Sequence, residues 1–164
     1  MVFAPSPAVL VRKTDGDAAR KHHIRLVIKN SGHDFIGRST APNSLSIWVH
    51  HMKGIELGKG SFSPKGCNVS IDGTGAYMTA LAGTQMYEAY SETAKINHTV
   101  IGGNGRTVAL GGFLTGGGHS ILAPAYGLAS DHVLEVDLVT PTGDIITANE
   151  CQNTDLFWAV RGVG

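Results

Sequence analysis

Two glycine-rich segments of the sequence carry residues that could bind an extended anionic cofactor. Residues 29–39 read KNSGHDFIGRS and place His33 just after an apolar run, and residues 111–119 read GGFLTGGGH. Glycine reaches positive φ and has no Cβ, so consecutive backbone N–H groups can point at phosphate oxygens from close range. Such loops need no side-chain cations, which suits a chain with a formal net charge of zero. The two segments therefore predict a dinucleotide site formed by two backbone loops.

Other nucleotide-binding and catalytic motifs do not occur in the sequence. The glycine pairs at 73–75 and 103–105 lack the third glycine of a G-x-G-x-x-G turn, and there is no G-x-x-x-x-G-K-[ST] phosphate loop and no G-x-S-x-G nucleophile turn. The adjacent histidines at 22–23 and 50–51 would point to opposite faces of a strand, and the spacings of zinc sites are missing. We therefore expect no metal site.

The order and spacing of five motifs resemble those of one family of flavoproteins. These motifs are GHDFIGRS at 32–39, GTQ at 83–85, the glycines of 111–118, YGLASD at 126–131 and NTDLFWAVRG at 153–162. The chain resembles the berberine-bridge-enzyme-like branch of the vanillyl-alcohol-oxidase flavoproteins, which carry a PCMH-type FAD-binding domain. The resemblance covers nearly the whole chain and implies FAD as the cofactor.

The resemblance implies a covalent bond to the flavin. In this family the histidine at the position of His33 is joined to the 8α-methyl group of the flavin, which needs a neutral imidazole nitrogen, and histidine is largely neutral near pH 7. Some relatives add a second link through a cysteine, but Ala109 stands at that position here, so we expect one link. The alternative is that His33 is an ordinary turn histidine, hydrogen-bonded to backbone groups.

The resemblance also implies which residues contact FAD. The loops at 29–39 and 102–118 would hold the cofactor, and the backbone at Val139 would lie beside the adenine. Ser31 replaces a glycine of many relatives and adds a hydroxyl, while Lys29 replaces an arginine and offers a point charge. His119 could face the flavin or be an ordinary loop residue. The expected cofactor-binding residues are Lys29, Asn30, Ser31, Gly32, His33, Asp34, Gly37, Ser39, Gly102, Gly103, Gly111, Gly112, Gly116, Gly117, His119, Asp131 and Val139.

By this resemblance the chain is the FAD-binding part of an oxidoreductase. The flavin would accept a hydride from an alcohol- or amine-type small molecule, and the electrons would pass to an acceptor, commonly O2 in this family. The alternative is a flavin-binding module without turnover of its own, because relatives continue beyond Gly164 into a substrate domain. The family's catalytic base lies in that part, so no catalytic residue is named. An apolar face left open to water would favour self-association.

The composition argues against nucleic-acid and membrane partners. The 13 Lys and Arg balance 13 Asp and Glu, and no basic run or aromatic ladder occurs. No apolar stretch approaches the roughly twenty residues of a membrane span. Cys67 and Cys151 could form a disulfide or stay two thiols. The glycosylation sequons at 68–70 and 97–99 matter only in the secretory path. The chain is therefore secreted if a signal peptide is missing from it, and cytoplasmic otherwise.

Hydrophobic periodicity predicts the elements that must position these loops. Strands are expected at 8–12, 25–29, 44–49, 69–71, 77–82, 134–140 and 144–148, the last two as a hairpin about the PTG at 141–143. Helices are expected at 15–21, 85–94 and 155–160, the last capped by Asn153 or Thr154, with a turn or short helix at 122–129.

Helices and strands mix without a regular βαβ repeat, so the fold class is α+β. The elements divide into two α/β lobes, at about residues 1–58, with the His33 loop, and at about 59–164. The resemblance implies that the second lobe is incomplete and that the substrate domain is absent.

Overall fold

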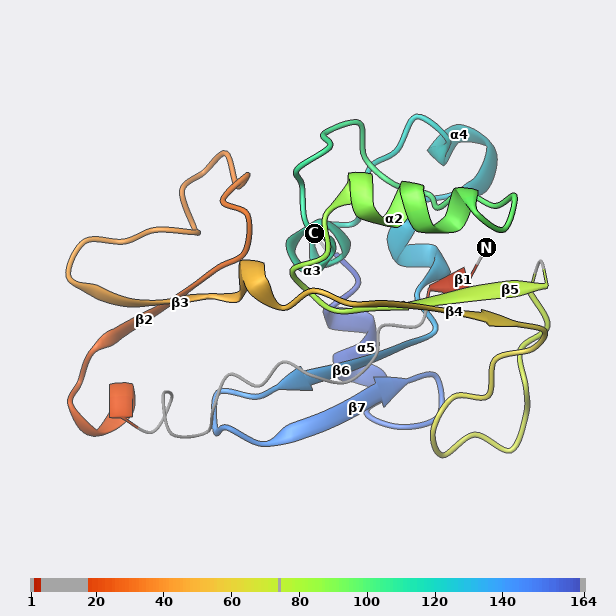
Figure 1. Cartoon of the computed structure of the whole chain (residues 1–164). Coiled ribbons are helices and arrows are strands. Elements are labelled where there is room, and N and C mark those ends of the chain that lie inside the picture. The colour runs from red at the N-terminus through yellow and green to blue at the C-terminus, as the bar shows by residue number, and fades with distance from the viewer. Residues whose placement is uncertain (1, 4–17, 74, 163–164) are drawn as a thin grey trace.

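The computed structural model describes residues 2–3, 18–73 and 75–162 and has a mixed α and β architecture (Figure 1). Its three-stranded sheet has the order β1-β5-β4. β1 (Val2–Phe3) runs parallel to β5 (Ala76–Ala80), and β4 (Ile55–Lys59) pairs antiparallel with β5. The predicted α+β fold class is confirmed.

Two further strand pairs lie among the described residues. β2 (Arg25–Lys29) and β3 (Ser44–Trp48) pair in parallel, and the 3-10 turn η1 (Val49–His51) follows β3 directly. β6 (Glu135–Val139) and β7 (Ile145–Asn149) form the hairpin expected about the PTG turn. Figure 1 shows β2 and β3 reaching away from the body of the molecule, while β6 and β7 lie below β4 and β5 in this view.

Short helices connect these strands. The helices are α2 (Met86–Ala94), α3 (Leu110–Thr115), α4 (Ala123–Tyr126), η2 (Ala129–His132) and α5 (Thr154–Ala159). α2 lies over β4 and β5 (Figure 1), and at its start Glu88 Oε2 accepts a hydrogen bond from the Gln85 amide at 2.7 Å. None of the described helices is both long and apolar enough to cross a bilayer.

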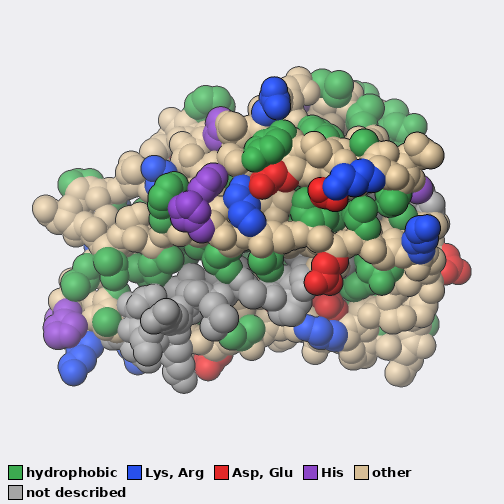
Figure 2. All heavy atoms as spheres, in the orientation of Figure 1, with side chains coloured by type: hydrophobic (Ala, Val, Ile, Leu, Met, Phe, Trp, Pro, Cys, Tyr) green, Lys and Arg blue, Asp and Glu red, His purple; other side chains and the backbone are tan. Residues whose placement is uncertain are grey.

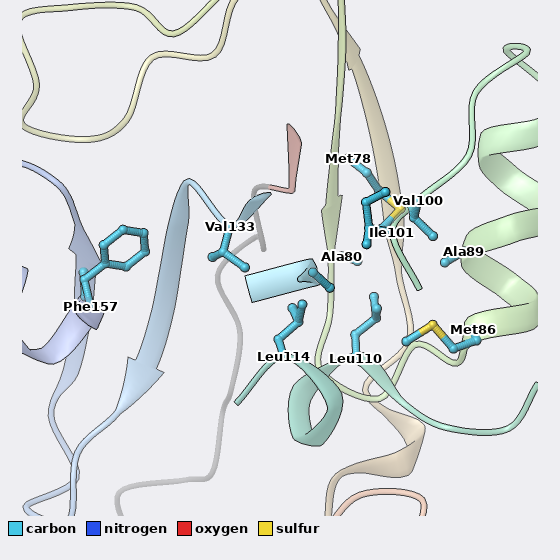
Figure 3. Close-up of a cluster of buried hydrophobic side chains, with 12 residues drawn as sticks. Met78, Ala80, Met86, Ala89, Val100, Ile101, Leu110, Leu114, Val133 and Phe157 are labelled. Atoms are coloured by element: carbon cyan, nitrogen blue, oxygen red, sulfur yellow. The ribbon is translucent and has the colours of Figure 1, made fainter. Parts of the chain in front are cut away.

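The core is formed where α2 and α3 meet the inner face of β5 (Figure 3). β5 buries every second residue, as expected for a strand with one face in the core. α3 contributes Leu110 and Leu114, which lie four residues apart on one face of the helix. Burial of each large apolar side chain stabilises the fold by about 1.5–3 kcal/mol. The cluster consists of Met78, Ala80, Met86, Ala89, Val100, Ile101, Leu110, Leu114, Ala129, Val133, Ala148 and Phe157.

Most predicted elements within the described residues are present. The strands at 25–29, 44–49 and 77–82 correspond to β2, β3 and β5, and the helices at 85–94 and 155–160 to α2 and α5. The strand expected at 8–12 lies outside the described residues. The helix expected at 15–21 lies partly outside them, and residues 18–21 are helical.

Three segments differ from the prediction. The strand at 69–71 is wrong: Ile71 makes only an isolated bridge to Phe62, and Val69 is exposed, so the segment has no core face to bury. β4 was not predicted, and Gly58 interrupts its apolar pattern. α3 was not predicted because its glycines indicate a loop. The predicted lobe boundary near residue 58 falls inside β4, which pairs with β5.

The β2–β3 arm, by which we mean residues 25–51, has few buried residues. Val27 and Val49 are buried in it, while Ile28 and Trp48 are each 54% exposed. Figure 2 shows hydrophobic side chains open on this part of the surface. The alternating pattern of β2 indicates a strand with one covered face, but among the described residues little packs against it. The arm therefore depends on specific contacts at its base, where it meets the body.

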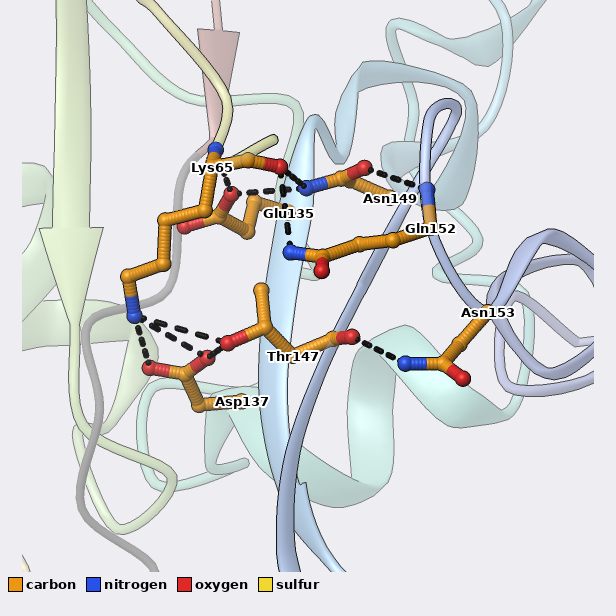
Figure 4. Close-up of polar contacts among 7 residues, drawn as sticks. All are labelled: Lys65, Glu135, Asp137, Thr147, Asn149, Gln152 and Asn153. Atoms are coloured by element: carbon orange, nitrogen blue, oxygen red, sulfur yellow. Dashed lines mark hydrogen bonds and ion pairs between the residues drawn. The ribbon is translucent and has the colours of Figure 1, made fainter. Parts of the chain in front are cut away.

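A disulfide between Cys67 and Cys151 fastens the loop at 60–73 to the turn after β7. Their Cα atoms are 5.4 Å apart. Polar contacts beside the bond hold the same loop to both strands of the β6–β7 hairpin (Figure 4): the Lys65 amide donates to Glu135 Oε2 at 2.7 Å, and Asn149 Nδ2 donates to the Lys65 carbonyl at 2.9 Å. The sequence left the state of these cysteines open, and the structure pairs them.

We predict that replacing both cysteines by serine lowers the free energy of unfolding by about 4 to 5 kcal/mol. The bond joins residues 84 positions apart and therefore restricts the unfolded chain strongly. Urea unfolding followed by circular dichroism measures the change. The reduced parent chain should unfold at the same midpoint as the double variant, and an oxidised parent with that midpoint would contradict the prediction.

Candidate functional site

A cavity of about 450 Å³ lies between the end of β2, the start of α3 and the β6 strand. Its walls are mostly apolar, as is usual for sites that bind flat organic cofactors. Four of the predicted cofactor-binding residues line it, namely Asn30, Gly111, Gly112 and Val139. The rest of the lining is Ile28, Val49, Ala80, Leu81, Ala82, Leu110, Leu114, Thr115, Val133, Val136, Asp137, Leu138, Val160 and Arg161.

The two glycine-rich segments meet at the carbonyl oxygen of Ala82. Asn30 Nδ2 donates to this oxygen at 2.6 Å, and the Gly111 amide donates to it at 3.0 Å. A Cβ added at Gly111 would lie 3.0 Å from both Asn30 Nδ2 and Ala82 Cβ. A side chain at Gly111 would therefore crowd the junction of the two segments, although Gly111 lies inside a helix.

The other amide atom of Asn30 has no partner among the described residues. Asn30 Oδ1 is buried and accepts no hydrogen bond, because the bond to Ala82 fixes the opposite side of the amide. A buried acceptor without a donor costs about 1–3 kcal/mol. Because Asn30 lines the cavity, a ligand that carries hydroxyl or amino donors would satisfy it. The hydroxyls of a dinucleotide fit this requirement.

His33 lies on the exposed side of the same junction. Its Nε2 atom is 2.8 Å from Thr107 Oγ1, and no described residue hydrogen-bonds to its Nδ1. Ser31 Oγ accepts from the Ala109 amide at 3.2 Å, so two side chains of the first loop bond to the segment before α3. Gly32, between them, has φ +87°, a conformation that favours glycine. These contacts hold the His33 loop against the second glycine segment.

The rest of the first loop folds on itself instead of lining the cavity. Asp34 accepts hydrogen bonds from the backbone amide of Arg38 at 2.6 Å and from its Nε at 2.9 Å. These bonds and the Arg38 charge lower the pKa of Asp34, and the hydrogen bond and charge of the Asp34 carboxylate raise the pKa of Arg38. Phe35 and Ile36 are exposed at the tip of the loop, and Gly37 has φ +79°. Asp34 therefore closes the turn that contains Gly37, and Ser39 lies directly after this turn.

Lys29 lies beside the arm and not in the cavity lining. Its Nζ is 5.9 Å from the centre of the Trp48 ring, within the range of a cation–π contact. Trp48 in turn donates from Nε1 to the Asn30 carbonyl at 2.8 Å. The indole thus bonds to the residue whose side chain reaches Ala82.

The remaining predicted residues lie outside the lining of this cavity. Gly102 and Gly103 are buried beside Tyr90, whose hydroxyl donates to the Gly103 carbonyl at 2.9 Å. Burial raises the pKa of the Tyr90 hydroxyl. Asp131 lies in η2, and its Oδ2 accepts a hydrogen bond from the amide of Leu128, the residue before η2, at 2.7 Å. Gly116 ends α3, Gly117 is buried with φ +92°, and His119 is exposed.

The segment at 106–109 lies inside the predicted loop at 102–118, but none of its residues was named as a cofactor contact; it lies across the first turn of α2. The amides of Met86 and Tyr87 donate to the carbonyls of Val108 and Arg106 at 2.9 and 3.0 Å. Gln85 Nε2 donates to the Thr107 carbonyl at 2.7 Å. The unpaired amides of a helix start therefore fix the strip that carries Thr107. No local sequence signal points to this segment, because Gln85 is not the Ser or Thr that starts the usual capping-box pattern.

Lys53 supports this capping arrangement from the side. Its Nζ is 2.6 Å from Glu88 Oε2, which also accepts from the Gln85 amide at 2.7 Å. Burial is the largest influence on the pKa of Glu88 and raises it, but the bonds from Lys53 and Gln85, with the charges of Lys53 and His50, together lower the pKa below its usual 4.5. Figure 2 shows histidine, basic and acidic side chains side by side over η1 and the start of α2.

Metal ligands do not gather in this region. Among residues 2–3, 18–73 and 75–162 no group of three or more His, Cys, Asp or Glu side chains is placed to hold a metal ion. The site instead consists of an apolar cavity, the unpaired side-chain oxygen of Asn30 and the backbone amides of the glycine-rich segments.

Comparison with known proteins gives a family match over most of the chain. The model of a family described as FAD binding domain matches residues 17–149. An uncharacterized FAD-linked oxidoreductase of Arthroderma benhamiae is 49% identical over 147 residues, which are 89% of this chain and 25% of the relative. A VAO-type flavoprotein oxidase of Thermothelomyces thermophilus is 41% identical over 149 residues, which are 89% of this chain and 24% of the relative.

A solved structure shares the fold. The crystal structure of a VAO-type flavoprotein from Myceliophthora thermophila superposes with a TM-score of 0.83 at 38% identity, over 93% of this chain and 27% of that one. The chain thus spans about a quarter of the length of the relatives it matches.

We predict opposite effects of alanine at two adjacent glycines of α3. Gly111→Ala should destabilise the chain by about 1–3 kcal/mol, because its Cβ would lie only 3.0 Å from Asn30 Nδ2 and Ala82 Cβ and would crowd the bonds to the Ala82 carbonyl. Gly112→Ala meets nothing within 4 Å and should be neutral or stabilise by up to about 1 kcal/mol, the usual gain in a helix. Urea unfolding of the FAD-free chain measures both, and equal changes would contradict the packing at Ala82.

We predict a pH-dependent loss of stability in Glu88→Gln, of about 1 kcal/mol at neutral pH. Because the folded-state pKa of Glu88 is below 4.5, its carboxylate stabilises the fold above that pH, and the stabilisation is lost as the pH falls through the folded pKa. Unfolding midpoints between neutral and acidic pH should converge for parent and variant. Glu92→Gln, in the exposed pair with Lys95, should change little, and a constant gap at every pH would reject the prediction.

Proposed function

The chain belongs to the FAD binding domain family, in its PCMH type, and from this membership we propose that its 450 Å³ cavity takes part of FAD in an oxidoreductase. The family is one of FAD-linked oxidoreductases, and its relatives include VAO-type flavoprotein oxidases. FAD is therefore the cofactor to which the site must be fitted.

One observation carries the proposal: Asn30, a residue of the cavity lining, has a buried Oδ1 that accepts no hydrogen bond from the described residues. A hydroxyl or amino group of FAD would donate to this atom. Gly111 and Gly112 leave room for close approach at the start of α3, and the strand backbone at Val139 would flank the adenine against apolar walls. The amides of residues 31–33 would face the pyrophosphate.

We further propose that FAD is held by a covalent bond to His33. The imidazole is exposed, its Nε2 is engaged with Thr107, and its Nδ1 is free of partners among the described residues. A free ring nitrogen on a positioned loop is what bond formation to the flavin needs. Ala109 offers no second nucleophile at the matching position, so the link would be single.

The reaction proposed for the complete protein is oxidation of an alcohol- or amine-type small molecule. Bound FAD would take a hydride from the carbon that bears the hydroxyl or amine, and O2 would take the two electrons to give H2O2. The word oxidase in the name of one relative supports O2 as the acceptor. The catalytic base and the substrate are not assigned to any residue of this chain.

The second candidate is a flavin-binding module without turnover of its own. The exposed apolar side chains of the β2–β3 arm and of the loop tip favour it, because such surface promotes association. Peroxide formation with alcohols, sugars and amines separates the two candidates. Steady turnover by a monomeric chain would reject the module, and turnover only in the complete protein would support it.

We predict that His33→Ala abolishes covalent attachment but leaves FAD bound reversibly, because the amides and the cavity remain. Acid precipitation should move the visible flavin absorption from the pellet to the supernatant. His22→Ala is the matched control and should keep the flavin in the pellet, since the exposed His22 lies outside both glycine-rich segments. Mass spectrometry identifies the modified peptide, and flavin on a peptide without His33 would show the assignment to be wrong.

A further inference from the structure

Thr107 is held more rigidly than an exposed loop residue usually is. The carbonyls of residues 106, 107 and 108 all accept hydrogen bonds from the start of α2, at 3.0, 2.7 and 2.9 Å. On the other side, the Ala109 amide donates to Ser31 Oγ at 3.2 Å. The backbone of Thr107 is therefore fixed between α2 and the His33 loop.

This fixed backbone presents the Thr107 hydroxyl to one nitrogen of His33 only. Oγ1 lies 2.8 Å from Nε2, and Nδ1 has no partner among the described residues. A hydrogen bond at one ring nitrogen of histidine determines which nitrogen carries the proton. An electrophile could reach Nε2 only after this bond is broken, whereas Nδ1 is open.

We propose that Thr107 is a positioning residue: its hydroxyl accepts from Nε2–H of His33, holding the tautomer whose Nδ1 lone pair forms the bond to the flavin. This rests on the covalent attachment proposed above. A neutral imidazole carries one proton, so a proton on Nε2 leaves a lone pair on Nδ1. The opposite tautomer would have its lone pair on the nitrogen that faces Thr107.

The hydroxyl also suits the state after attachment. The bond that forms joins Nδ1 to the flavin 8α carbon, and the bonds that break are one C–H of that methyl group and Nε2–H. Two protons exchange with solvent, and the two electrons stay on the flavin until O2 removes them as H2O2. Nε2 then has a lone pair, and the Thr107 hydroxyl turns from acceptor to donor, as a hydroxyl can.

The test compares Thr107→Val, which keeps the shape but not the hydroxyl, with Thr107→Ser, which keeps the hydroxyl. Nitrogen-15 NMR of the FAD-free chain, at a pH where imidazole is neutral, reports which nitrogen of His33 carries the proton. His33→Ala identifies its signals. We expect the Nε2–H form to dominate in the parent and Thr107→Ser, and to lose that dominance in Thr107→Val.

The second readout is the rate of covalent attachment, followed by intact mass after FAD is added. Thr107→Val should slow attachment about fivefold, the effect of one ordinary hydrogen bond, and Thr107→Ser should restore it. The affinity for FAD before attachment should be equal in all three chains. This equality separates a role in positioning His33 from a general loss of structure.

The outcomes distinguish this role from the proposed tether. A parent chain that never gains the mass of FAD at His33 would reject the tether and the role together. Attachment that is equally fast in Thr107→Val, or a parent His33 with its proton on Nδ1, would reject the role of Thr107 alone.

Discussion

The carbonyl oxygen of Ala82 is the contact on which the candidate site depends. It accepts one hydrogen bond from the first glycine-rich segment, through Asn30, and one from the second, through Gly111, although Asn30 and Ala82 are 52 residues apart. The bond to Asn30 also fixes the amide so that its oxygen is left without a donor. One backbone atom therefore joins the two segments and leaves an unpaired acceptor on Asn30, a residue of the cavity lining.

Helix capping supplies the second constraint. The first amides of a helix need acceptors, and in α2 they take them from the backbone at 106–108 and from Glu88. The need to satisfy a helix end thus fixes a strip of chain that has little regular structure of its own. Through Thr107 and Ser31 that strip holds the His33 loop, so the contacts that stabilise α2 also position the residue proposed to carry the flavin.

Stability and candidate function are unevenly distributed over the chain. The body of the molecule is stabilised by the core between β5, α2 and α3 and by the Cys67–Cys151 disulfide. The β2–β3 arm contributes the His33 loop but buries little of its own apolar surface. Local opening is easier where few apolar contacts are made. The arm is therefore held at its base by a few polar bonds, and those bonds decide where His33 lies.

The sequence by itself determined the local features. Hydrophobic alternation located β2, β3 and β5, the PTG turn predicted the β6–β7 hairpin, and the motif around His33 indicated a flavoprotein of the family that the comparisons then showed. These signals depend on neighbouring residues, so they can be read along the chain. The tertiary structure decided the rest. The glycines of 111–112 became helical because Leu110 and Leu114 are buried in the core, and Cys67 paired with Cys151 because the fold brings their Cα atoms to 5.4 Å. Thr107 meets His33 across 74 residues of sequence, and no local pattern encodes a contact between segments so far apart.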